Sequence, residues 1–532
     1  MANRQHPRSR SLPFLVALAA LMQALAALLM PAQRLPAQRV PAQGGAARLD
    51  LRIDGGSLPG TIEIDLAGGL AFQQSGLIFL SLTTGPTPLA LVDLLDPRSL
   101  DVGLELSGVA ISGPFLVGGL FDAPALPVPN LPQIVDRPLY FQGLSVPGQP
   151  RLVDRLSLPR AVRFAPTGAF RDRFVALSNP RSFFPVLPGD DGRVLAAGGG
   201  SGAIFAQVAR KDSEWFDPVT DSFSPGPDMT VERSLQTATT LPDGRVLIVG
   251  GVDGLNDPLA RAEIWDPVAG SFTATGSMAT PRMGHDATLL LDGRVLVSGG
   301  ITDLNAPVTP IDPIFSITRS TEIFDPATGR FTAGPQLRAP RAGHHSIRRG
   351  DGRVLLCGGV SWSLFFPQVL ASTDVFHPGT GTISAGPSML QARAQGTTTP
   401  LQAGRWLLAG GVGTISLTQW GTPTDRAEIY DQAGDRFIDA GRMAARRALH
   451  VAFPIGGGRV MLAGGGDGTL FALTPLGSSE IFDSSTGLWS AGPLMQLPRT
   501  APGLYRTATG QAHLLGGEGP NTVDRSTEFY YR

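Results

Sequence analysis

The stretch PRMGHDATLLLDGRVLVSGG at 281–300, followed after a loop by TEIFDPATGRF at 321–331, contains the pattern that decides the fold. An apolar run without alternation ends in a Gly-Gly doublet, which is typical of a strand buried on both faces. An acid–apolar–aromatic triplet follows the loop, and a Pro- and Gly-containing turn leads to a second aromatic. The stretch therefore predicts four short strands, named A to D here, with the doublet at the end of B and the triplet in C.

This unit is repeated seven times at intervals of 49 to 59 residues. The doublets begin at Gly198, Gly250, Gly299, Gly358, Gly410, Gly464 and Gly516. An arginine stands seventeen residues before each doublet: Arg181, Arg233, Arg282, Arg341, Arg393, Arg447 and Arg499. An acid begins each triplet: Glu214, Glu263, Glu322, Asp374, Glu428, Glu480 and Glu528. Seven four-stranded units of about 50 residues predict an all-β fold, a seven-bladed β-propeller.

The repeats resemble the kelch motif, in which a Gly-Gly doublet precedes two aromatics separated by six residues. The resemblance covers about 172–532 and implies a kelch-type propeller, like those of kelch adaptor proteins and galactose oxidase. This fold hosts both binding proteins and enzymes, so the resemblance alone does not decide the function.

The chain ends directly after the seventh strand C, so the last blade lacks its strand D. An unpaired sheet edge at that place would be a liability. Counting back from Arg181 puts Leu177 in the column that ends the other D strands, whereas the aromatic slot falls on Arg171, next to Phe170. We therefore predict that about 170–179 pairs with Glu528–Arg532 and closes the propeller, which spans 170–532.

Two segments precede the repeats. Residues 1–32 contain a basic start and an uncharged apolar run at 11–30, which predicts a secretory signal peptide or, alternatively, a retained anchor helix. Residues 33–45 form a Pro- and Gln-rich linker. Residues 46–165 alternate apolar and polar positions between frequent turns, which predicts a small β-sandwich-like module. We expect a secreted, periplasmic or cell-surface protein that is not inserted in a membrane if the signal is cleaved.

Composition excludes several classes of protein. The net charge of -1 speaks against a nucleic-acid partner. The single cysteine, Cys357, excludes an intrachain disulfide and zinc sites that need several cysteines. Hydrophobic residues make up 42% and charged residues 16%, which suits large cores rather than a disordered chain.

No catalytic or cofactor site is predicted. Resemblance to galactose oxidase implies a Cys–Tyr crosslink, an adjacent Tyr-His pair and a further His on copper, but this chain has no Tyr-His dipeptide. Cys357 aligns with Ser298, Ala409 and Ala463, as a small buried residue would. A histidine column at His285, His344 and His450 has two readings, a metal site or local hydrogen bonds, and we favour the second.

The arginine column also has two possible interpretations. Seven like charges need partners, and the seven acids begin at the same end of each blade, so the column predicts buried ion pairs. The alternative is an anion-binding ring. In either case the column belongs to the framework that all blades share.

Function is expected where the repeats differ, which is mainly in the B–C loops. Three consecutive loops, in units three to five, carry large apolar residues that no strand needs. These candidate ligand-binding residues are Phe315, Trp362, Phe365, Phe366 and Trp420. Such rings mark partner or sugar-stacking surfaces, or they pack the loops on one another or on 46–165. We expect a non-catalytic module that binds an extracellular protein or glycan; the alternative is an extracellular carbohydrate-active enzyme on a galactose oxidase-like propeller.

Overall fold

The computed structural model describes 168–202, 207–304, 316–363, 366–415, 421–469, 472–506, 511–520, 523 and 525–531, together with twelve strands within 50–166. All regular elements among these residues are strands, and none is a helix that could cross a membrane. The predicted signal segment and linker lie outside the described residues.

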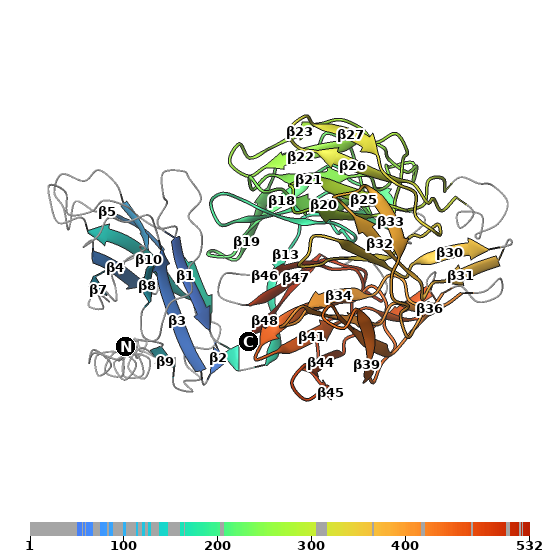
Figure 1. Cartoon of the computed structure of the whole chain (residues 1–532). Coiled ribbons are helices and arrows are strands. Elements are labelled where there is room, and N and C mark those ends of the chain that lie inside the picture. Colours follow the sequence, from blue (N-terminus) through green and yellow to red (C-terminus); the bar gives the residue numbers. More distant parts are fainter. Residues whose placement is uncertain are drawn as a thin grey trace, which may run out of the picture.

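The repeats form seven four-stranded antiparallel sheets arranged in a ring (Figure 1). Blade 1 contains β14 (Val186–Pro188), β15 (Val194–Ala197), β18 (Ser213–Asp217) and β19 (Ser222–Pro225). Blade 2 contains β20 (Thr237–Thr240), β21 (Val246–Val249), β22 (Ala262–Asp266) and β23 (Ser271–Ala274). Blade 3 contains β24 (Asp286–Leu289), β25 (Val295–Ser298), β26 (Thr321–Asp325) and β27 (Arg330–Ala333). Blade 4 contains β28 (His345–Arg348), β29 (Val354–Cys357), β32 (Thr373–His377) and β33 (Thr382–Ala385).

The remaining blades follow the same order A, B, C, D. Blade 5 contains β34 (Thr397–Pro400), β35 (Arg405–Ala409), β38 (Arg426–Asp431) and β39 (Arg436–Arg442). Blade 6 contains β40 (Val451–Gly456), β41 (Arg459–Ala463), β44 (Ser479–Asp483) and β45 (Leu488–Ala491). Blade 7 contains β46 (Gly503–Arg506), β47 (Ala512–Leu515) and β48 (Ser526–Tyr531), with β13 (Ala169–Ala176) as its outer strand.

Strand β13 confirms the predicted closure of the ring. It pairs antiparallel with β48, and Phe170 stands opposite Tyr530 with ring centroids 5.3 Å apart. The expected slot at Arg171 is off by one because the register shifts between Asp172 and Ala176. Leu177 is buried, and its N–H donates to the carbonyl of Arg525, as its column predicted.

Every blade buries strand B between its neighbours, as the apolar runs predicted. All four residues of β21, β25 and β29 are buried. The two aromatic columns face each other on strands C and D, for example Phe324 and Phe331 with ring centroids 4.9 Å apart. Packing between neighbouring blades therefore supplies most of the core.

The antiparallel order gives the propeller two faces. The B–C face consists of the B–C loops and the connections from strand D to the next strand A. The A–B face, at the opposite end, consists of the A–B and C–D turns. Because Ala169 pairs with Tyr531 at the end of strand C, the chain enters blade 7 from the A–B face.

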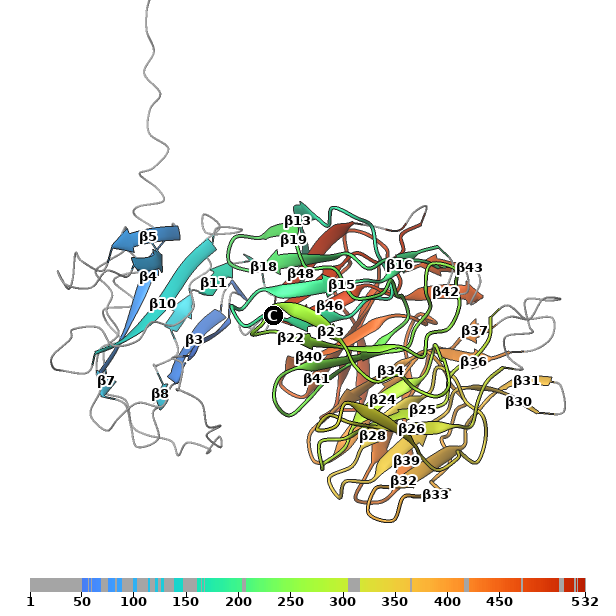
Figure 2. The same ribbon diagram turned by 90° about the horizontal axis from the view of Figure 1, so that it is seen from above.

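Four B–C loops contain hairpins that the sequence did not indicate. They are β16 (Gly200–Ser201) with β17 (Val208–Ala209), β30 (Val360–Ser363) with β31 (Phe366–Val369), β36 (Val412–Thr414) with β37 (Thr422–Pro423), and β42 (Gly466–Thr469) with β43 (Ala472–Pro475). The last three follow one another in contact along one side of the propeller (Figure 2).

Within 50–166 the structure also has strands only. They are β1 (Asp50–Gly55), β2 (Ser57–Leu58), β3 (Gly60–Ala67), β4 (Ser75–Ser81), β5 (Thr84–Pro88), β6 (Ser99–Val102), β7 (Gly113–Pro114), β8 (Leu120–Asp122), β9 (Leu126–Val128), β10 (Pro138–Val146), β11 (Arg160–Arg163) and β12 (Ala165–Pro166). One sheet has the order β1-β3-β8, with β9 also on β3, and a second has the order β11-β10-β4-β7. The sandwich-like packing of these sheets and the domain boundaries stay predictions.

Candidate functional site

The arginine column is buried and paired. All seven side chains are 0% exposed, and each contacts the acid of its own unit at 2.8 to 3.2 Å. Arg341 is typical: its Nη2 donates to Asp374, and its Nη1 donates to the carbonyls of Gly358 and Ser372. Burial lowers the pKa of Arg341, and the charge of Asp374 opposes that shift. The guanidinium thus joins the start of strand A to the end of B and the start of C.

The acids hold the connection from the preceding blade. Glu322 accepts hydrogen bonds from Arg282 and from the backbone N–H groups of Ala279 and Thr280, at 2.7 to 3.1 Å. Each pair therefore clamps three segments of backbone. Because their guanidiniums are enclosed, the arginines have no surface to present to an anion.

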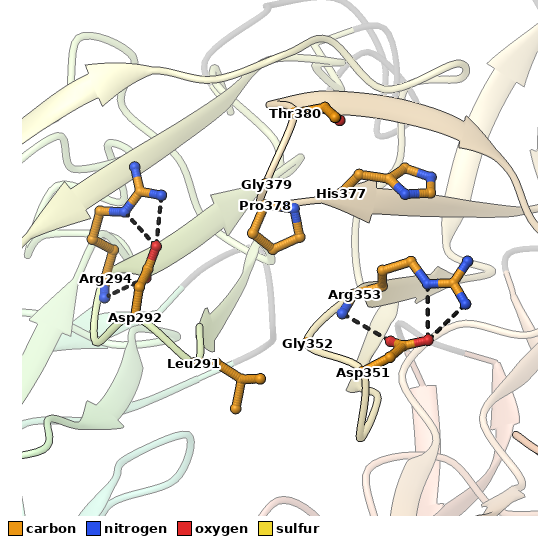
Figure 3. Close-up of a pocket in the computed structure, with 10 residues that line it drawn as sticks. All are labelled: Leu291, Asp292, Arg294, Asp351, Gly352, Arg353, His377, Pro378, Gly379 and Thr380. Atoms are coloured by element: carbon orange, nitrogen blue, oxygen red, sulfur yellow. Dashed lines mark hydrogen bonds and ion pairs between the residues drawn. The ribbon is translucent and has the colours of Figure 1, made fainter.

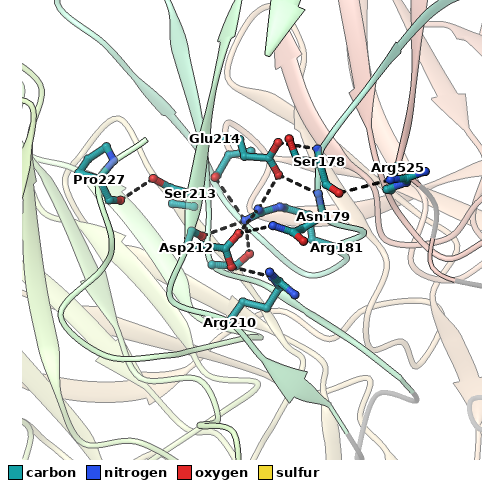
Figure 4. A network of polar contacts seen from close by, with 12 residues as sticks. Ser178, Asn179, Arg181, Arg210, Asp212, Ser213, Glu214, Pro227 and Arg525 are labelled. Atoms are coloured by element: carbon teal, nitrogen blue, oxygen red, sulfur yellow. Dashed lines mark hydrogen bonds and ion pairs between the residues drawn. The ribbon is translucent and has the colours of Figure 1, made fainter. Parts of the chain in front are cut away.

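Blade 1 extends this clamp at the ring closure (Figure 4). Arg181 contacts a second acid, Asp212, which also pairs with Arg210. Burial works to raise the pKa of Asp212, but the hydrogen bonds and charges of Arg210 and Arg181 outweigh it and lower the pKa. Arg525 of blade 7 donates to the carbonyl of Ser178, so blades 7 and 1 are joined here as well.

The histidine column makes local hydrogen bonds to the preceding blade. Nε2 of His285 lies 2.9 Å from Oγ1 of Thr237, and Nε2 of His450 lies 2.8 Å from Oγ1 of Thr397. His344 is bonded in the same way to the hydroxyl of Ser298. Burial lowers the pKa of His285 to about 3 and lowers the pKa values of the other two well below the usual value. These imidazoles are neutral at pH 7 and stabilise contacts between blades.

A cavity of about 420 Å³ lies at the mouth of the central channel on the B–C face. Residues from all seven blades line it, from the first residues of each strand A and the segment before it. The ring that surrounds it consists of Phe183, Leu235, Gly284, Gly343, Gln395, Leu449 and Ala501, each two residues after a column arginine. All seven have left-handed φ angles, between 46° and 60°.

This left-handed ring is linked by backbone hydrogen bonds between neighbouring blades. The N–H of Ala501 donates to Leu449 at 2.8 Å, and the N–H of Phe183 donates to Ala501 at 3.4 Å across the closure. Non-glycine residues adopt this conformation at a cost, so the surrounding structure must hold them there. Repeat comparison alone did not reveal the ring, since its residue types differ from unit to unit.

The cavity has two different walls. Blades 6, 7 and 1 contribute an apolar wall that includes Phe183, Phe184 and Leu449. Blades 2 to 5 contribute polar groups that include Gln236 and Asp286. Oε1 of Gln236 is buried and has no hydrogen-bond partner among the described residues, although its Nε2 donates to Ala197. Burial raises the pKa of Asp286.

The predicted aromatic residues have different outcomes. Phe315, Phe365 and Trp420 lie outside the described residues. Phe366 lies in β31 and is 60% exposed. The expectation that Trp362 is exposed and belongs to no strand is wrong: it lies in β30, partly buried, and packs against an apolar cluster that includes Val252 and Ile301. Formation of the β30–β31 hairpin turns this ring toward the blades.

Comparison with known proteins supports the kelch assignment. The model for the Kelch motif matches residues 234–279. Two galactose oxidase sequences from Gibberella zeae are 35% identical over 85 residues, which is 16% of this chain and only 12% of each relative. A fungal alcohol oxidase of the AA5 family, solved in complex with copper, is 17% identical, with a TM-score of 0.51 over 68% of this chain and 76% of that chain. The structure of YjhT covers 57% of this chain and 96% of its own at a TM-score of 0.43, with 15% identity.

The described residues do not fit the copper site that the oxidase resemblance implies. No group of three or more His, Cys, Asp or Glu side chains converges among them. In each column histidine, Nε2 is already hydrogen-bonded to a hydroxyl group. Cys357 is fully buried in strand β29, which raises the pKa of its thiol, and Tyr430 of the same core cluster donates its hydroxyl to Asp435.

The repeat spacing, the seven closed blades and the motif match all indicate kelch-type repeats. The chain therefore contains a seven-bladed β-propeller built from kelch-type repeats, part of which is similar in sequence to galactose oxidase.

Proposed function

We propose that this propeller is a non-catalytic module that binds an extracellular protein or glycan at the channel mouth and the B–C loops around it. One observation carries the proposal: Gln236 lines the channel cavity, and its side-chain Oε1 is buried without a hydrogen-bond partner among the described residues. A buried acceptor without a donor costs about 1–3 kcal/mol, and a ligand hydroxyl or amide would supply that donor. A cavity of about 420 Å³ with one apolar and one polar wall is typical of ligand sites.

The route of the chain supports this face. Residues before Ala169 enter from the A–B face, so the B–C face is not the side on which the N-terminal segment joins the propeller. Phe366 is exposed in the B–C hairpin of blade 4, on the same face of the propeller. Phe315, Phe365 and Trp420 lie outside the described residues, and we predict that they belong to the same ligand surface. Trp362, in the same hairpin as Phe366, packs against an apolar cluster of the blades.

Substitution of Gly284 tests the channel without removing a polar group. A Cβ at Gly284 meets nothing nearer than 3.9 Å, and leucine already occupies the equivalent positions 235 and 449. On glycan and protein arrays, the purified chain should bind a defined ligand and Gly284→Leu should lose that binding while melting within a few degrees of the parent. Full binding by Gly284→Leu would place the ligand outside the channel.

A second variant tests the loops. Phe366→Ala should weaken the same binding severalfold, whereas Leu488→Ala, on an equally exposed apolar residue of the A–B face, should not. Equal binding by both variants would remove Phe366 from the ligand surface.

The alternative function is oxidation of a carbohydrate or other alcohol on copper, and the match to galactose oxidase favours it. A chain loaded with copper should then release hydrogen peroxide from galactose or a primary alcohol. We expect no peroxide above the copper-free control, because the described side chains do not supply the ligand set. Peroxide formation that saturates with substrate would overturn the binding-module proposal.

A further inference from the structure

A second cavity lies on the A–B face, between blades 3 and 4 (Figure 3). It measures about 550 Å³ and is bounded by two Asp-Gly-Arg turns and by the C–D turn of blade 4. Each arginine is fixed by the aspartate of its own turn: Arg294 contacts Asp292 at 2.6 and 2.9 Å, and Arg353 contacts Asp351 at the same two distances. The two arginine side chains are 38% and 39% exposed, and the ion pairs hold their guanidiniums in place before any ligand arrives.

The two aspartates use both oxygens within their turns. Oδ1 of Asp351 accepts the backbone N–H of Arg353, while Oδ2 accepts its Nε and Nη2, and Asp292 repeats the arrangement. Nη1 of neither arginine has a partner among the described residues. The cavity is thus formally neutral, with two arginines and two aspartates, but each of these arginines still has a free donor at Nη1. Such a site favours a ligand rich in acceptors.

Blade 4 differs from the other blades at this place. The C–D turn begins with an aspartate in five units: Asp217, Asp266, Asp325, Asp431 and Asp483. In blades 2 and 3 the charge of this acid helps to raise the pKa of the turn arginine in the same blade, as Asp325 does for Arg294. Blade 4 has His377 instead, whose Nε2 is bonded to the hydroxyl of Ser384. Asp435 lies outside the turn of Arg353, and its charge helps to raise the pKa of that arginine. Oδ1 of Asp435 already accepts hydrogen bonds from Arg349 and from the Tyr430 hydroxyl.

We propose that this cavity binds an acidic saccharide of linked uronate units, with Arg294 at one side of the cavity and Arg353 at the other (Figure 3). The replacement of an aspartate by His377 removes a carboxylate that would repel the ligand. Leu291, 65% exposed, and Pro378 provide an apolar surface for the C–H face of a sugar ring. The volume suits one or two sugar rings, and this site is independent of the channel mouth on the opposite face.

Calorimetric titration with trigalacturonate tests the proposal on the full chain. Binding is expected, and it should weaken as salt is raised because the contacts are charged and partly exposed. The carboxyl-reduced, neutral trisaccharide should not bind. Equal binding of the neutral sugar, or of oligoglutamate, would overturn the uronate assignment, and so would no binding of trigalacturonate.

Three variants locate the site. Arg353→Gln should weaken trigalacturonate binding about tenfold, and His377→Asp, which restores the residue of the other turns, should weaken it severalfold. Arg193→Gln is the matched control, because Arg193 occupies the same turn in blade 1 but lies 4.5 Å over the ring of Trp215. An equal loss in Arg193→Gln, or no loss in His377→Asp, would overturn the site. If Arg353→Gln does not fold, His377→Asp decides alone. Gly284→Leu should bind trigalacturonate normally, which separates this site from the channel.

Discussion

The arginine column and the left-handed ring lie two residues apart in every unit, but one is defined by a constant residue type and the other by a constant backbone conformation. In the column the residue type is the same in all seven units, because the guanidinium itself makes the contacts to the acid and to two carbonyls. In the ring the backbone conformation is the same, with φ from 46° to 60°, while five residue types occur. Backbone groups make the bonds of the ring, so its side chains are free to differ and to serve a ligand.

Opening the circle is the most severe test, because both features need all seven blades. Removal of 1–185 takes away β13 and the start of blade 1, so we expect an open ring that aggregates. Removal of 1–165 keeps β13 and should leave a soluble propeller. Size-exclusion chromatography and thermal unfolding measure both outcomes, and cooperative folding of a soluble 186–532 fragment would contradict the role of β13.

Truncation within the arginine column should have the next largest effect. Arg341→Ala leaves Asp374 buried without its partner, which costs about 3–5 kcal/mol of unfolding free energy. Arg353→Ala breaks an exposed pair, which is worth less than about 1 kcal/mol. Denaturant unfolding of both variants compares them directly. Similar losses would mean that the buried column is no more structural than a surface pair.

Acid should destabilise the propeller through the buried histidines. The pKa of His285 is about 3 in the folded chain, below the ordinary value of 6.5, so the unfolded state takes up the proton first. Stability is therefore full above pH 6.5 and falls as the pH drops toward 3, by about 1 kcal/mol per pH unit for each such histidine.

Blade 2 has Gln236 at the position that corresponds to His285, so the two residue types can be exchanged in both directions. His285→Gln should flatten the fall in melting temperature between pH 6.5 and 4, and Gln236→His should steepen it. Parallel pH profiles for the parent chain and both variants would show that other groups control the acid sensitivity.

Exchange within the left-handed ring should have the smallest effect on stability. Gln395→Gly removes the energetic cost of a left-handed backbone conformation at a non-glycine residue, about 1–2 kcal/mol. Glycine is also more flexible in the unfolded chain, which offsets about 0.5–1 kcal/mol of this gain in stability. A net change within about 1 kcal/mol is expected in denaturant unfolding. A loss of several kcal/mol would show that the side chain, and not the backbone, holds the ring.

Much of the fold was predictable because the same pattern occurs seven times. The doublets, arginines and acids located strands B and C, and the missing strand D led to β13. The error of one residue at Phe170 arose because a register shift leaves no sign in residue spacing. The hairpin at β30–β31 was missed for a related reason: it occurs in only some loops, so no repeat column marks it.

The candidate sites were less predictable from residue type. Trp362 was expected on the surface because it lies in a B–C loop, where the repeats differ, but a hairpin packs it against the blades. Gln236 gave no sign in the sequence, since only the assembled ring makes it a lining residue of the channel cavity. His377 was visible as an exception among five aspartates, but its meaning depends on the neighbouring turn of blade 3.

The sequence by itself determined the number of blades, the strand order within each blade and the framework pairs, because those features follow from local hydrophobic pattern and from repetition. Only the tertiary structure decided which groups remain unsatisfied. Whether a side chain is left with a free donor or acceptor depends on the blade beside it, about 50 residues away in the chain, and on the circle being closed. The channel mouth, which residues of all seven blades line, is a product of that closure.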